Sequence, residues 1–329
     1  MANDKRRVRG RTRARRKGPT TAEFFDEWLH SIAHSVKPST LSRYDVFVRL
    51  HAVPAFGQVR LRDLSPSDLE RLYARELRDG AAAVSVVHLH NVLHRALSHA
   101  QRRGLVETNV TKLVDPPRAQ RHEMQSLSPE EARRFLKVVR GDRLEALYVL
   151  AITTGMRQGE LHALRWRDVD LAGGALRVTS SIQYVKGKGL HMSSPKTQRS
   201  RRQVMLSKTA VEALARRREA QHRERARQGD KWQDGDFIFT SRNGQPIYAT
   251  NVVNRWFPKL LRSAGLPRIR FHDLRHTAAT LLLGQGVHPK IVSEMLGHTS
   301  IGITLDLYSH ATPTIQKEAT AAFDRLLRD

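Results

Sequence analysis

Apolar residues recur every three or four positions through residues 20 to 115, with polar residues between them. This spacing places the apolar side chains on one face of an α-helix, so the whole stretch is predicted to be helical. Proline and glycine mark the helix ends. The four predicted helices begin at Thr20 or Thr21, at Pro38, at Ser65 and at residue 84; the second ends by Pro54 and Gly57, the third at Gly80 and the fourth at Gly104.

A change of composition separates this helical part from the rest of the chain. Pro116, Pro117 and the polar residues up to Ser126 are typical of a linker. Directly afterwards, Ser128 and Glu131 have the spacing of a capping box, which starts a helix. We therefore predict a disordered basic tail over residues 1–18, a helical domain over 19–117, a linker over 118–126 and a second domain over 127–329.

The second domain is predicted to mix helices with short β segments. Helices are expected over 143–153, from Arg157, and over 208–227, 251–264, 289–296 and 307–327, and β segments over 166–170, 175–180 and 181–206, with a turn at Gly173-Gly174 and a buried strand at Phe237-Ile238-Phe239. The helix over 208–227 is rich in arginine and is expected to be exposed. The predicted fold class is multidomain and mainly α: an all-helical domain followed by a mixed α+β domain with a small antiparallel sheet.

The charge balance indicates a polyanionic partner. The chain has 57 Lys and Arg against 32 Asp and Glu, which gives a net charge of +25. A surplus of this size favours nucleic acid over an acidic membrane, because no basic amphipathic helix with an aromatic or leucine face stands out. The basic tail is expected either to add phosphate contacts that do not depend on sequence or to act only as a solubilising segment.

Composition also excludes several kinds of site. The chain has no cysteine, which rules out disulfides, thiolate nucleophiles and thiolate metal ligands. No run of eighteen apolar residues is present to span a membrane, and no apolar segment of a signal peptide follows the basic N-terminus, so a cytoplasmic, nucleoid-associated location is expected. His90 and His94 have metal-ligand spacing but no evident third ligand, so we expect no metal and a side that faces solvent or DNA.

Residues 271–310 hold side chains that suit phosphodiester chemistry. His272, Arg275, His298 and Tyr308 supply two imidazoles, one guanidinium and one phenol, which can bind and attack a phosphodiester. Arginine suits a phosphate because its planar fork matches the phosphate oxygens and stays charged. Acidic residues are sparse near these basic motifs, so a route without a metal ion is expected.

Five short motifs together resemble the tyrosine recombinases, also called phage integrases. They are TGMRQGEL (154–161), SPKT (194–197), HDLRH (272–276), LGH (296–298) and LYSH (307–310). Each motif alone is weak, but the set is highly specific in order and spacing, and the resemblance covers about residues 20–327. It implies that the helical part is a core-binding domain, that the remainder is a catalytic domain, and that the two close round duplex DNA.

The resemblance implies a role for each of six residues. Tyr308 would be the nucleophile that forms a 3′-phosphotyrosyl bond and frees a 5′-hydroxyl. Arg157 and Arg275 would hold the scissile phosphate, Lys196 would be the general acid toward the leaving oxygen, His272 would assist proton transfer at the tyrosine, and His298 would hydrogen-bond a phosphate oxygen. A free phenol has a pKa near 10, so the tyrosine needs nearby cations and a base. The covalent intermediate conserves bond energy, so neither ATP nor another cofactor is expected.

Two assignments stay open from the residues alone. Lys186 and Lys188 also lie near predicted β turns, although the basic run at 199–202 favours Lys196 as the general acid. Glu160, one turn after the first motif arginine, either orients that arginine through an ion pair or is an ordinary acid on a helix surface.

The resemblance also implies the partners. These are double-stranded DNA with specific core sites, a homotetramer assembled on that DNA, and an excisionase or host DNA-bending protein. The segment from Pro313 to Leu327 resembles the one that docks on a neighbouring protomer, with docking on its own core as the alternative. Many phage-type integrases begin with a folded arm-site-binding domain, whereas only about eighteen basic residues precede Thr20, so accessory arm-type sites are in doubt.

The leading interpretation is a site-specific recombinase that integrates or excises a phage or another mobile element through a Holliday junction. A helix-turn-helix regulator is an alternative for residues 274–296, with a turn at 284–287, but it leaves Arg157, Lys196 and Tyr308 unexplained. A type IB topoisomerase would share the chemistry; the two-domain layout and the LGH motif favour a recombinase.

Overall fold

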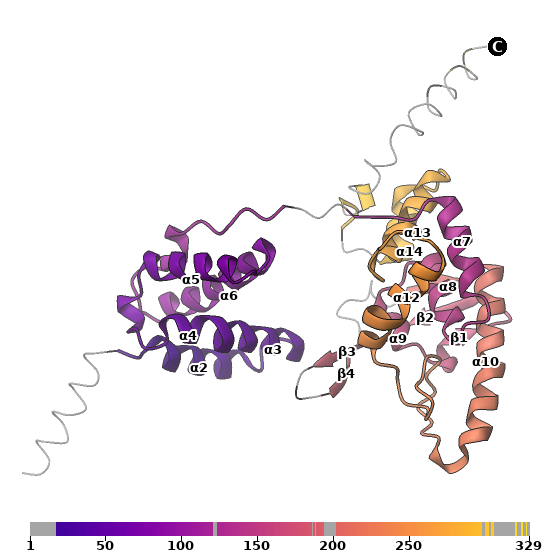
Figure 1. Cartoon of the computed structure of the whole chain (residues 1–329), viewed down its shortest axis with the longest axis horizontal. Helices are drawn as coiled ribbons and strands as arrows, with labels where there is room; N and C mark the ends of the chain where they lie inside the picture. Colours follow the sequence, from indigo (N-terminus) through magenta and orange to yellow (C-terminus); the bar gives the residue numbers. More distant parts are fainter. Residues whose placement is uncertain are drawn as a thin grey trace, which may run out of the picture. The chain divides into compact units, whose positions relative to one another are not determined.

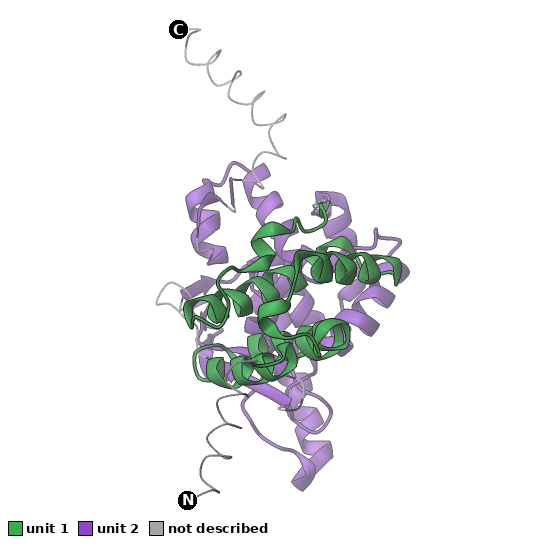
Figure 2. Ribbon diagram, turned by 90° about the vertical axis from the view of Figure 1, so that its left-hand side faces the viewer, with its two compact units in different colours: residues 1–122, 185–187 green, residues 123–184, 188–329 purple. Residues whose placement is uncertain are grey.

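A computed structural model (Figure 1) describes residues 18–120, 124–185, 187, 189–193, 202–297, 300–302, 304–305, 320, 324 and 327. The chain divides into two compact units, coloured separately in Figure 2. Unit 1 comprises residues 1–122 and 185–187, and unit 2 comprises residues 123–184 and 188–329. The predicted tail up to residue 17 and most of the predicted helix over 307–327 lie outside the described residues.

Unit 1 is helical throughout its described part, as the apolar spacing predicted. Its elements are α2 (Thr21–Ile32), α3 (Pro38–Phe47), the π-helix η1 (Val48–Ala52), α4 (Val53–Phe56), η2 (Leu61–Asp63), α5 (Pro66–Arg78), α6 (Ala83–Arg102) and η3 (Val110–Leu113). Thr20 caps α2 in a capping box with Glu23, and Phe24, Phe25 and Trp28 on that helix are buried. Burying such an apolar face is the main source of stability for a short helix.

Two prolines lie just after π-helical turns. Pro54 in α4 follows η1, and Pro258 in α12 (Phe257–Ser263) follows the π-helix η7 (Val252–Trp256). A proline in a helix lacks an N–H group and its ring clashes with the carbonyl four residues earlier, and a wider turn relieves that clash. The second predicted helix therefore continues through Pro54 and ends at Gly57.

His90 and His94 on α6 have structural partners in unit 1, which corrects the expectation of a solvated or DNA-facing side for these two rings. A ring nitrogen of His90 lies 3.0 Å from the hydroxyl of Tyr73 on α5. A ring nitrogen of His94 lies 2.7 Å from the hydroxyl of Thr111 in η3. Both rings are half-buried, so their polar atoms need partners inside the protein.

Unit 2 combines helices with short strands. Its further elements are α7 (Pro129–Val139), α8 (Glu145–Thr154), α9 (Gln158–His162), η4 (Trp166–Asp168), β1 (Val169–Asp170), β2 (Ala175–Val178), β3 (Ser181–Val185), β4 (Gly189–Ser193), β5 (Arg202–Met205), α10 (Lys208–Gln228), η6 (Gly229–Lys231), α11 (Ala249–Asn251), α13 (Asp273–Gly284) and α14 (Pro289–Leu296). Strands β1, β2 and β5 form an antiparallel sheet in that order, with Leu176 opposite Val204, and β3 pairs with β4. The predicted fold class is confirmed.

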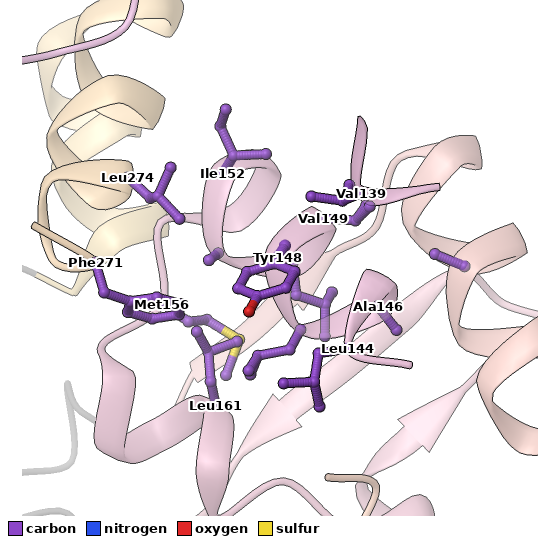
Figure 3. Packing of buried hydrophobic residues seen from close by; sticks show 14 of the residues in the cluster. Val139, Leu144, Ala146, Tyr148, Val149, Ile152, Met156, Leu161, Phe271 and Leu274 are labelled. Atoms are coloured by element: carbon purple, nitrogen blue, oxygen red, sulfur yellow. The ribbon is translucent and has the colours of Figure 1, made fainter. Parts of the chain in front are cut away.

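Helix α8 is the centre of unit 2. Nearly every residue of it is buried, so it has no exposed face, as expected for a helix in the middle of a core. It contacts α7, α9, α10 and α13. Figure 3 shows Tyr148 of α8 among Met156, Leu161, Phe271 and Leu274, which come from the segments that carry the motif arginines.

Two expectations for unit 2 were wrong. Helix α10 is not exposed on all sides, because Leu214, Arg217 and Gln221 face the core and are buried. The segment Phe237–Phe239 is buried but forms only isolated backbone contacts, among them an antiparallel bridge between Phe237 and Arg165 and a bond from Ile247 N–H to Phe239 O at 3.2 Å. Side chains of α10 take the other two carbonyl groups, since Gln221 donates to Phe237 O at 2.8 Å and Arg217 to Ile238 O at 3.0 Å. Side-chain donors thus satisfy part of this backbone, and no continuous strand forms there. None of the helices in the described part of the chain is long and apolar enough to cross a membrane.

The turn after α8 is packed closely against α13 and α14. Gly155 caps α8 with φ +60°, and a Cβ atom there would overlap the side chain of Leu296 and lie 3.3 Å from Cβ of Ala278. Gly265 has the same φ of +60°, but a Cβ atom there meets nothing within 4 Å.

This pair gives a test of the packing. We expect Gly265→Ala to lower the free energy of unfolding by about 1 kcal/mol, the penalty for a left-handed alanine. Gly155→Ala should lower it by a further ~1–3 kcal/mol, because the overlap with Leu296 adds to that penalty. Urea denaturation of the two variants measures the difference, and equal losses would contradict the packing described.

Candidate active site: an arginine cluster at the end of α14

Arg157, predicted to hold a phosphate, stands at the N-terminus of α9. Its backbone N–H donates to Oε2 of Glu160 at 3.0 Å, and its Nη1 donates to Oε1 of the same carboxylate, also at 3.0 Å. The Arg157 side chain is 38% exposed, whereas that of Glu160 is 7% exposed. Glu160 is therefore not a surface acid: the ion-pair alternative is confirmed, and Arg157 is held while part of its guanidinium still meets solvent.

Arg275, the second predicted phosphate ligand, lies in the first turns of α13 and is buried. Its Nη1 donates to the carbonyl of Gly155 at 2.7 Å and to that of Leu296 at 2.8 Å. It therefore ties the turn before α9 to the end of α14. Among the described residues no partner accepts from its Nε or Nη2, which leaves three N–H groups for an incoming oxygen.

Arg202, at the start of β5, completes the cluster. Its Nη2 donates to Oε2 of Glu160 at 2.9 Å, its Nη1 lies 3.3 Å from Oε1, and its Nε donates to the carbonyl of Met295 at 2.9 Å. The sequence interpretation counted this residue only as part of a basic run. The alternation along β5 is the signal that could have found it, because Arg202 lies on the same side of the strand as buried Val204.

The C-terminus of α14 is where the three arginines meet. The carbonyls of Met295, Leu296 and Gly297 each accept a hydrogen bond from a different guanidinium, those of Arg202, Arg275 and Arg157, the last at 2.6 Å. Helix C-termini carry unpaired carbonyls and partial negative charge, which cations stabilise. Gly297, with φ +68°, then turns the chain toward His298.

The cluster keeps a positive charge. Three guanidinium groups and one carboxylate leave two positive charges uncompensated. Burial favours a higher pKa for Glu160, but the hydrogen bonds and charge of Arg202 and Arg157 outweigh it and lower that pKa. Burial, with the nearby charges of Arg157 and Arg202, lowers the pKa of Arg275 to about 9, so Arg275 remains charged at neutral pH.

His272 directly precedes α13, three residues before Arg275. Its ring lies 5.3 Å from that of His276, edge to face, and the residue is exposed. Partial desolvation, together with the nearby charges of His276 and Arg275, lowers the pKa of His272 to about 4. The imidazole is therefore neutral at neutral pH and can accept a proton.

The structure brings Arg157 and Arg275 together from segments far apart in the sequence and adds Arg202 and Glu160 to them. The other predicted site residues, Lys196, His298 and Tyr308, lie outside the described residues.

Comparison with known proteins decides the family. Residues 125–314 match the phage integrase family, and residues 20–77 match the N-terminal SAM-like domain of phage integrases. The chain belongs to the phage integrase family. As the motif set indicated, it is a tyrosine recombinase, an enzyme of site-specific DNA recombination.

Curated relatives of the chain include tyrosine recombinases and integrases of other bacteria. A tyrosine recombinase XerC-like protein of Caldanaerobacter subterraneus subsp. tengcongensis is 31% identical over 93% of this chain and 82% of its own length. An integrase of Streptomyces ambofaciens is 31% identical over 92% of this chain and 79% of its own.

Solved structures share the fold. The Tn1549 transposon integrase, in complex with a circular intermediate DNA, matches 94% of this integrase and all of its own chain with a TM-score of 0.77 at 22% identity. A lambda integrase tetramer bound to a Holliday junction matches 90% of this chain and 79% of its own with a TM-score of 0.66 at 20% identity.

The ion pairs of Glu160 predict a large and pH-dependent effect of Glu160→Gln. The change leaves Arg202 buried without its counter-charge, so we expect about 3 kcal/mol lower free energy of unfolding at neutral pH. The pKa of Glu160 is lowered on folding, so its contribution is full above the unfolded pKa of about 4.3 and is lost as the pH falls through the folded value. Wild type and variant should therefore converge in acid.

Urea denaturation at a series of pH values measures this difference. Glu130→Gln is the control, because Glu130 pairs with Arg133 on the surface, where both side chains are mostly exposed. A Glu160→Gln variant as stable as the control at neutral pH would rule out a structural role for the buried carboxylate.

Proposed function

We propose that this integrase cleaves and rejoins DNA at specific core sites through a 3′-phosphotyrosyl intermediate and a Holliday junction, without a metal ion or ATP. One observation carries the proposal: Arg157 and Arg275, from the first and third of the five motifs, are held together at the end of α14 with N–H groups left over. Preorganised donors of this kind stabilise the charge that develops on a phosphate under attack.

The remaining motif residues supply the chemistry in this proposal. The oxygen of Tyr308 attacks the phosphorus and forms the new P–O bond, while the bond to the 5′-oxygen breaks. Lys196 gives a proton to that leaving oxygen, and His272, neutral before the reaction, accepts the proton of the phenol. His298 donates a hydrogen bond to a phosphate oxygen. Religation is the reverse, with a 5′-hydroxyl as the nucleophile, and needs no outside energy source.

The two parts of the chain have separate tasks in the proposal. Residues 19–117 are the core-binding domain and residues 127–329 the catalytic domain, joined by the linker over 118–126; the tail over 1–18 adds phosphate contacts. The lambda integrase tetramer on a Holliday junction supports assembly of four copies on DNA. In the proposal, the segment from Pro313 to Leu327 docks on a neighbouring protomer. In the proposal, the enzyme integrates or excises a mobile element. It acts on chromosomal DNA in the nucleoid, and an excisionase or a host DNA-bending protein is its partner.

A helix-turn-helix regulator fits the site less well. Helices α13 and α14 do form two helices joined by a short turn. However, Arg275 of α13 is buried rather than displayed at a surface, and its Nη1 is held by the carbonyls of Gly155 and Leu296. A recognition role also gives no reason for three guanidinium groups to gather at the end of α14.

Covalent capture tests the proposal. The purified full chain is incubated with nicked duplexes of random sequence, and adducts that resist SDS are isolated and sequenced from the attached 3′ end. We expect wild type to form adducts at a defined sequence, and Tyr308→Phe to bind that duplex with unchanged affinity but form none, because it lacks the attacking oxygen.

Three results would contradict parts of the proposal. Adducts formed by Tyr308→Phe would refute the nucleophile. Specific binding by wild type without any adduct would favour a regulator. Adducts without sequence preference, together with relaxation of supercoiled plasmid, would favour a type IB topoisomerase.

A further inference from the structure

Arg202 differs from the other two arginines of the cluster in what it leaves free. Three of its five N–H groups are used on Glu160 and on the carbonyl of Met295, and its side chain is 8% exposed. Arg157 is 38% exposed by comparison, and Arg275, although buried, keeps its Nε and Nη2 without a partner among the described residues. Arg202 thus faces the inside of the cluster, where it contacts other protein groups.

We propose that Arg202 is a positioning residue of the recombination reaction: it shares the carboxylate of Glu160, so that the charge of Arg157 stays available to the transition state, and it fixes the end of α14. The inference rests on the proposed function, in which Arg157 and Arg275 bind the scissile phosphate.

Charge explains why a third arginine is needed. Without Arg202, the buried carboxylate of Glu160 would compensate Arg157 alone, and one positive charge would remain instead of two. A phosphodiester has one negative charge, and attack by the phenolate oxygen brings a second until the 5′-oxygen leaves with its proton. With Arg202 present, the cluster matches the transition state better than the ground state, and only such a difference accelerates the reaction.

Geometry gives Arg202 a second effect. Its Nε holds the carbonyl of Met295, three residues before His298, while its Nη atoms hold Glu160 on α9. Removing Arg202 would remove its hydrogen bonds to both carboxylate oxygens of Glu160 and to the carbonyl of Met295 at the same time. Both the orientation of Arg157 and the direction in which the chain leaves α14 depend on these contacts.

Unit 2 contains a matched control for this role. Arg217 is also buried, with 2% of its side chain exposed; it shares Glu224 with Arg143, and its Nε donates to the carbonyl of Ile238 at 3.0 Å. This is the same arrangement of two arginines, one glutamate and one carbonyl, built around α10 and the turn before α8 rather than from the motif segments. Its role is structural only, so Arg217→Met separates loss of stability from loss of catalysis.

The experiment measures single-turnover cleavage by the full chain on a nicked duplex with the sequence recovered by covalent capture. The scissile group is either the normal phosphate or a methylphosphonate, in which a methyl group replaces one non-bridging oxygen and removes one negative charge. Each variant is given both substrates from one preparation, so a fraction of unfolded protein lowers both rates by the same factor.

We expect Arg202→Met to slow cleavage of the phosphate by roughly 100-fold, the size of losing one electrostatic contact to the transition state, and to slow the methylphosphonate much less. Arg202→Lys should recover part of the rate on the phosphate because it keeps the charge. Arg217→Met should change both substrates by the same factor. DNA affinity in a Tyr308→Phe background should hardly change for any of them.

Other results would overturn the inference. Equal slowing of the two substrates by Arg202→Met would mean that the residue only supports the fold. An unchanged rate on both substrates would mean that it supports neither the fold nor the reaction. Arg157→Met, measured alongside, separates this from the proposed function. If Arg157→Met abolishes cleavage of the phosphate while Arg202→Met does not distinguish the substrates, only the inference on Arg202 fails.

Discussion

The buried carboxylate of Glu160 between two arginines is the interaction on which the site depends. A carboxylate with 7% exposure is strongly unfavourable unless its oxygens are paired, and here they accept from Arg157, Arg202 and the backbone of α9. This requirement brings β5 and the start of α9 together. The end of α14 is held in turn because its carbonyls need donors and the arginines have donors left. Hydrogen bonding of these polar groups fixes the positions of the three guanidinium groups.

Apolar packing supplies the frame that makes this possible. Helix α8 is buried on all sides, and the turn at Gly155 that follows it carries Arg157 on one side and accepts a hydrogen bond from Arg275 on the other. The core side chains around Tyr148 come from the same segments, so the arginines stand on elements that cannot shift independently (Figure 3). A phosphate-binding site gains from such rigidity, because donors fixed in advance need no reorganisation during the reaction.

Local signals predicted the helices of unit 1, the helix start at Thr20, the capping box at Ser128, the mainly α class and the motif arginines, since these depend on spacing along a few residues. The errors arose where the partner is distant in sequence. His90 and His94 were assigned to solvent or DNA because their partners come from other elements. Arg202 was overlooked because Glu160 lies 42 residues away, and the apolar segment at 237–239 was taken for a strand because side chains of α10 satisfy two of its carbonyls. Pairings of this kind are fixed by tertiary structure, which periodicity does not report.

The most direct test is a crystal structure of Tyr308→Phe bound to the uncleaved duplex recovered by covalent capture. The distances to measure run from the non-bridging oxygens of the scissile phosphate to the guanidinium nitrogens of Arg157 and Arg275. We predict hydrogen-bond distances of about 2.7–3.2 Å to both residues, with Glu160 still paired to Arg202 beneath them. A scissile phosphate bound away from these two arginines, or a Glu160 carboxylate opened to solvent, would contradict the account.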